Sequence, residues 1–174
     1  MGQIDFNKLW QNFLDTVTNH YFDMRGRVSR AQFWYYVLVE VVIAIGLAII
    51  QSIAFLPGLL TAIFGLAMLL PNVGMATRRM QDTGRSAMLV WVAFIASAVM
   101  QIIAILGVIG GAMGALGFLI IFFTFGWIIS LIAIVAGIAV IYFCVQPGTV
   151  GPNQFGPEPA VWSPGAPTPA APTV

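Results

Sequence analysis

Two short arginine clusters and one aspartate are the residues of this sequence best suited to specific chemistry. The clusters are Arg25, Arg27 and Arg30, and then Arg78, Arg79 and Arg85 with Asp82 among them. A guanidinium can hold a carboxylate or a phosphate through two parallel hydrogen bonds, which fixes geometry as well as adding energy. We therefore expect Asp82 to accept hydrogen bonds from Arg27, Arg30 or Arg79.

This candidate cluster has two interpretations that do not involve catalysis. Its members are Arg27, Arg30, Arg78, Arg79, Asp82 and Arg85. The favoured interpretation is structural: the contacts clamp the start of the first spanning helix to the loop that carries the second cluster. The alternative is that arginines not neutralised by Asp82 form a pocket for anionic phospholipid headgroups or for an acidic partner.

Glu40 is a separate candidate, an ionisable residue inside an apolar stretch. It follows Trp34 by six residues, which is about 9 Å at the rise of a helix. An ionisable group at membrane depth is by default a candidate for function. The favoured interpretation is nevertheless snorkelling, or pairing with a nearby arginine at the interface.

Motifs of catalysis and cofactor binding are missing from the sequence. It holds no P-loop, no G-x-S-x-G, no H-E-x-x-H and no C-x-x-C. The single histidine, His20, and the single cysteine, Cys144, have no clustered partners for a metal site. We expect no enzyme, no catalytic residue, no metal and no cofactor. The net charge of +1 gives no indication of nucleic-acid binding.

Long runs without charge place these residues in a membrane protein. No Asp, Glu, Lys or Arg occurs in residues 41–77 or 86–157, and 60% of the chain is hydrophobic. A span needs about 20 apolar residues, so the 45 residues from 33 to 77 fit two helices and a tight hairpin, and the 61 residues from 86 to 146 fit two spans and a loop. The sequence predicts an all-α polytopic membrane protein with four transmembrane helices. We place them near residues 33–55, 59–77, 87–106 and 117–145.

Residues 5–22 have helical apolar spacing but are too polar to span a membrane. Phe6, Trp10 and Phe13 lie on the apolar face, with Asn12 and other polar residues opposite. This amphipathic helix either lies in the headgroup layer or docks on the bundle. Ser29 and Gln32 form a capping box, which predicts that the first spanning helix begins near Arg30.

The connections and the tail have their own signals. Gly107, Gly111 and their neighbours match a G-x-x-x-G packing pattern, but a loop or flexible helix end is favoured there. Asn72, Gln51 and Gln101 are expected to hydrogen-bond between helices. Eight of the ten prolines fall from Pro147 onward, which predicts a disordered tail, either a flexible end or a docking peptide. The expected parts are residues 1–28, the amphipathic segment; 29–146, the membrane domain; and 147–174, the tail.

The charge pattern also predicts orientation. Two helices between the arginine clusters put both clusters on one side, and positive loops face the cytoplasm. The N-terminus and the C-terminus are therefore expected in the cytoplasm.

Three segments resemble the motifs of a bacterial inner-membrane family, domain of unknown function 805. They are G-R-V-S-R-A-Q-F-W at 26–34, R-R-M-Q-D-T-G-R-S at 78–86 and G-P-N-Q-F-G-P at 151–157. The resemblance covers about residues 20–160, with the motifs in the family's order. It implies a small multi-pass inner-membrane protein and supplies no established activity.

The expected function is a non-enzymatic membrane interaction or lipid-organising module, self-associating as a homo-oligomer. Its expected partners are membrane lipids, anionic headgroups among them, and other membrane proteins. The alternative is a small channel or transporter subunit. Few polar residues are available near the midplane for such a path: Gln51, Gln101, Thr124 and Ser130.

Overall fold

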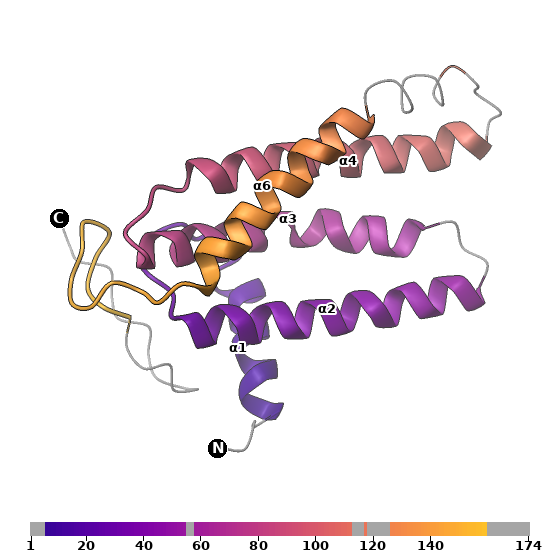
Figure 1. The fold of residues 1–174 in the computed structure, drawn as a ribbon. Helices are drawn as coiled ribbons and strands as arrows, with labels where there is room; N and C mark the ends of the chain where they lie inside the picture. Colours follow the sequence, from indigo (N-terminus) through magenta and orange to yellow (C-terminus); the bar gives the residue numbers. More distant parts are fainter. Residues whose placement is uncertain (1–5, 55–57, 113–116, 118–125, 160–174) are drawn as a thin grey trace. The chain divides into compact units, whose positions relative to one another are not determined.

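The computed structural model describes residues 6–54, 58–112, 117 and 126–159, and the described part is helical. The helices are α1 (Phe6–Thr18), α2 (Arg30–Ile53), α3 (Leu59–Asp82), α4 (Met88–Ala112) and α6 (Trp127–Val145) (Figure 1). The last four are long and apolar enough to cross a membrane. Within the described ranges the only bridge between extended residues is an isolated one, between Asn153 and Gly156. The prediction of an all-α protein with four spans is confirmed.

The ends of the α2–α3 hairpin show how local sequence sets the helix bounds. The Gln32 N–H donates to Ser29 Oγ at 3.3 Å, so α2 begins at Arg30 as the capping box predicts. Helix α3 continues five residues beyond the predicted end at Thr77 and carries Asp82 in its last turn. Gly84, at φ 75°, then ends α3: its N–H donates to the Gln81 carbonyl and the next N–H to the Met80 carbonyl.

The glycines from residue 107 to 111 lie at the end of a helix. Helix α4 continues through Gly107, Gly110 and Gly111 to Ala112, so of the two predicted alternatives, a loop or a flexible helix end, these residues form a helix end. Apolar neighbours favour this outcome, since a helix satisfies its own backbone groups where no water is available. The predicted start of the fourth span, after Gly117, lies largely outside the described residues, and α6 accounts for its second part.

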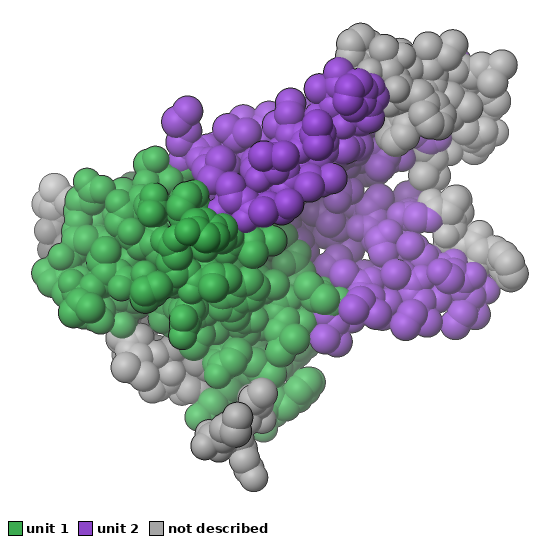
Figure 2. All heavy atoms as spheres, viewed as in Figure 1, with its two compact units in different colours: residues 1–41, 70–87, 141–174 green, residues 42–69, 88–140 purple. Residues whose placement is uncertain are grey.

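The chain divides into two compact units, coloured in Figure 2. Unit 1 comprises Met1–Val41, Leu70–Ala87 and Ile141–Val174; unit 2 comprises Val42–Leu69 and Met88–Val140. In unit 2, Gln51 Nε2 donates to Thr61 Oγ1 at 3.1 Å and Gln51 Oε1 accepts from the Thr61 N–H at 3.3 Å. These bonds close the α2–α3 hairpin, as expected for a polar group that joins helices in lipid.

Helix α1 docks against α2 and α3 within unit 1. Phe13 stacks on Tyr36 with 5.6 Å between ring centroids, and Asn12 Nδ2 donates to the Gln32 carbonyl at 2.9 Å. The prediction that Asn12 lies opposite the apolar face is therefore corrected: it is buried at the docking face. A second apolar stripe of α1 stays exposed, at Phe6, Trp10 and Leu14.

Candidate functional site

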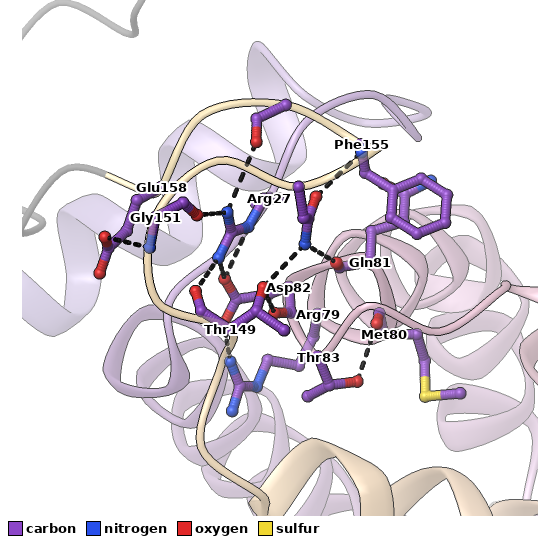
Figure 3. A network of polar contacts seen from close by, with 12 residues as sticks. Arg27, Arg79, Met80, Gln81, Asp82, Thr83, Thr149, Gly151, Phe155 and Glu158 are labelled. Atoms are coloured by element: carbon purple, nitrogen blue, oxygen red, sulfur yellow. Dashed lines mark hydrogen bonds and ion pairs between the residues drawn. The ribbon is translucent and has the colours of Figure 1, made fainter.

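Asp82 is the centre of the candidate site. It lies in the last turn of α3, where the partial negative charge of the helix end disfavours a carboxylate. Two arginines, Arg27 and Arg79, supply the positive charge that stabilises the Asp82 carboxylate at this helix end. Arg27 Nε donates to Asp82 Oδ1 at 3.0 Å, the Nη2 of the same guanidinium lies 2.9 Å from that oxygen, and Arg79 Nη1 donates to Oδ2 (Figure 3). The side chains are 1% (Arg27), 0% (Arg79) and 4% (Asp82) exposed.

Other nitrogens of both arginines donate to backbone carbonyls in the last turn of α6 and in the segment after it. Arg27 Nη1 donates to the Gly151 carbonyl at 2.6 Å and Nη2 to the Thr149 carbonyl. Arg79 Nε donates to the Cys144 carbonyl at 3.0 Å and Nη2 to the Gln146 carbonyl. We call Arg27, Arg79, Asp82 and these carbonyls the arginine network. It joins the segment before α2, the end of α3 and the chain after α6.

Residues 147–159 are not disordered, which corrects the expectation for this part of the tail. The Thr149 N–H donates to the Asp82 carbonyl at 2.8 Å, and Asn153 Nδ2 donates to the Gln81 carbonyl at 2.9 Å. Asn153 and Gly156 exchange backbone hydrogen bonds of 3.0 Å, and the Phe155 N–H donates to Asn153 Oδ1 at 2.9 Å. Residues 160–174 of the predicted tail lie outside the described residues.

The glycines of this segment have separate roles. Gly151 and Gly156 adopt φ 77° and 134°, conformations that favour glycine. Gly148 is needed for space instead, because a Cβ there would overlap the Asp82 carboxylate. The G-P-N-Q-F-G pattern is thus the sequence signal for a turn docked on the α3 end, a signal that composition alone does not show.

The other members of the predicted cluster lie in different surroundings. Arg78 is buried, with Nη2 3.2 Å from Met75 Sδ and Nη1 3.9 Å from Asp23 Oδ2. Arg30 is exposed in the first turn of α2. Arg85 is also exposed, and its guanidinium carbon lies 4.2 Å from the centre of the Phe143 ring. Structure therefore brings Arg27 and Arg79 to Asp82, and it leaves Arg30 and Arg85 on the surface.

Asp23 supports the turn between α1 and α2. Partial burial raises the pKa of its carboxyl, but the Arg25 N–H, His20 and Arg78 together outweigh burial, so the pKa lies below its ordinary value.

Across the described residues, no group of three or more His, Cys, Asp and Glu is placed to hold a metal ion.

Glu40 does not pair with an arginine as expected. Its Oε1 accepts a hydrogen bond of 2.7 Å from Asn72 Nδ2, and the Asn72 Oδ1 accepts one of 2.8 Å from the Tyr36 hydroxyl. The arginines near these helix ends have other surroundings: Arg27 and Arg79 bind Asp82, Arg78 is buried near Asp23, and the others are exposed. Asn72, which the sequence predicts to join helices, supplies the partner instead.

Comparisons with known proteins agree with this architecture. A family model described as protein of unknown function (DUF805) matches residues 21–157. The inner membrane protein YhaH of Escherichia coli K12 is 30% identical over 148 residues, covering 82% of this chain and 92% of that protein. The inner membrane protein YhaI of the same organism is 27% identical over 151 residues, covering 83% and 92%. No solved structure matches significantly.

Proposed function

The chain belongs to the family described as protein of unknown function (DUF805) and is a multi-pass inner membrane protein, and on this basis we propose that it is a non-enzymatic module that binds anionic lipid headgroups. The headgroup site is formed by exposed arginines, chiefly Arg30 and Arg85, on the surface around the arginine network. The network itself is the scaffold for this surface and does not bind the lipid.

One observation carries the proposal: every nitrogen of Arg27 and Arg79 is hydrogen-bonded within the protein, whereas Arg30 and Arg85 are exposed in the same unit. The guanidiniums of Arg27 and Arg79 are almost fully buried against protein acceptors, so a phosphate in the headgroup layer cannot reach them. The exposed guanidiniums can donate to one. The exposed stripe of α1, with Phe6 and Trp10, adds an apolar and aromatic surface typical of the headgroup layer.

The proposed orientation places this surface in the cytoplasmic leaflet. Helix α1, the turn after α3 and the segment after α6 meet in unit 1, so they share one side of the membrane. The arginines of that side assign it to the cytoplasm. A C-terminal green fluorescent protein fusion should then fluoresce, and a C-terminal alkaline phosphatase fusion should be inactive. Active phosphatase and a dark fluorescent fusion would place the surface in the opposite leaflet.

Self-association completes the proposal. Only 11–17% of the most apolar window of α2, α4 or α6 is buried within the chain. Lipid or a second copy of the protein covers the rest. A homo-oligomer would place several headgroup surfaces side by side and raise the local concentration of anionic lipid.

Native mass spectrometry from lipid nanodiscs tests the lipid proposal. The wild type should retain phosphatidylglycerol in preference to phosphatidylcholine. Replacing Arg30 and Arg85 together by glutamine should weaken that retention about thirty-fold, at about 1 kcal/mol per arginine. Lys8→Gln is the matched control, since it removes an exposed positive charge from α1. Equal retention by the double variant and the wild type, or an equal loss in Lys8→Gln, would refute the proposal.

A further inference from the structure

Three polar side chains form a hydrogen-bonded chain inside the spans of unit 1. The Tyr36 hydroxyl donates to Asn72, and Asn72 donates to Glu40. Glu40 is ten residues from the start of α2 at Arg30, and Asn72 is ten residues from the end of α3 at Asp82. At helical rise both lie about 15 Å from that end, about half the thickness of a hydrocarbon core.

Among the described residues, Glu40 forms no ion pair with a positively charged side chain. Its hydrogen-bond donor is a neutral amide. The titratable group that faces it is Tyr36, with Tyr21 beyond. A carboxylate removed from water without a cation is costly, and binding a proton removes the charge.

We propose that Glu40 is a proton-binding site within the membrane. The carboxylate takes up one proton from water and becomes a neutral carboxylic acid, and the reverse step returns the proton to water. Because Oε1 accepts the Asn72 hydrogen bond, the proton resides on Oε2. Tyr36 fixes the Asn72 amide with its oxygen toward the hydroxyl and its nitrogen toward Glu40, so the acceptor geometry is preserved in both states.

Helix α1 covers the approach to this site within unit 1. Phe13 stacks on Tyr36, and both rings are buried. Tyr36 in turn lies one helical turn from Glu40 on α2. Shortening Phe13 to alanine should open space beside Tyr36 and speed proton exchange at Glu40.

Infrared spectroscopy of the protein in nanodiscs tests the site directly. In a pH titration, one protonated-carboxyl carbonyl band should weaken as the pH rises. Glu40→Gln should abolish that band. Glu158→Gln is the matched control, because the chain has only these two glutamates and Glu158 is exposed. A spectrum without any band that Glu40→Gln removes, or one in which Glu158→Gln removes the same band, would overturn the proposal.

A second measurement leaves Glu40 itself unaltered. Dicyclohexylcarbodiimide adds to protonated carboxyl groups in apolar surroundings and leaves a stable N-acylurea, which mass spectrometry locates on the chain. The adduct should form at Glu40 and decline with rising pH, and Phe13→Ala should change its rate. No adduct at Glu40 at any pH would contradict the site. This result is separate from lipid binding, because the Arg30 and Arg85 variants should keep both the band and the adduct.

Discussion

Replacing Asp82 by asparagine should lower the free energy of unfolding by about 3 to 5 kcal/mol, the usual cost of breaking a buried ion pair from one side. The two guanidiniums that bind the Asp82 carboxylate are almost fully buried, so both would keep their charge and lose their counter-charge. The shape of the side chain barely changes. Titration with sodium dodecyl sulfate in mild detergent micelles, followed by tryptophan fluorescence, measures the effect.

Asp15→Asn is the control for this prediction. It makes the same change at a carboxyl of α1 whose side chain is 45% exposed and which binds Asn19 and His20 locally. Exposed pairs of this kind contribute about 0 to 1 kcal/mol. If the Asp82→Asn and Asp15→Asn proteins unfolded at the same concentration of sodium dodecyl sulfate, the arginine network would not support the fold.

Gly148→Ala is expected to be the most damaging change within the region after α6. The added methyl group would overlap the Asp82 carboxylate, which two arginines hold in place and which therefore cannot move away cheaply. Either the segment after Gln146 lifts off or the network loosens, at a cost of about 1 to 3 kcal/mol. Limited proteolysis should then cut between residues 147 and 159 faster than in the wild type.

Gly137→Ala provides the comparison, since a Cβ at Gly137 in α6 meets no atom within 4 Å. In a disordered proline-rich tail, glycine to alanine would have no consequence. If Gly148→Ala and Gly137→Ala were cleaved at the wild-type rate, close contact between Gly148 and Asp82 would be disproved.

Patterns that repeat along the chain made the fold predictable. Charge-free runs of fixed length define the spans, and the Ser29 cap and Gly84 mark helix ends through local chemistry. The contact between the two clusters was also predictable, because Asp82 was the one carboxylate between arginines that the topology brings to the same side. The end of α3 was not predictable in this way. The charges of Arg78 and Arg79 indicated the end of the span, whereas the backbone continues as a helix to Asp82.

The features that the sequence did not predict are hydrogen bonds to backbone carbonyls and hydrogen bonds between residues far apart in the sequence. The carbonyls bound by Arg27 and Arg79 belong to residues whose side chains carry no charge, so the sequence does not show which backbone groups the arginines bind. Proline content favoured disorder after Pro147, yet each hydrogen bond to the α3 end removes part of that freedom. Asn12 and Glu40 were misplaced for a related reason: their partners, Gln32 and Asn72, lie on other helices.

Hydrogen–deuterium exchange of the wild type in nanodiscs tests the central claim most directly, that the arginine network holds the chain after α6 against α3. The account predicts slow exchange of the backbone amides of Thr149, Asn153 and Gly156, and faster exchange of the same amides in Asp82→Asn. Exchange of residues 149–156 in the wild type at the rate of an unstructured peptide would contradict it.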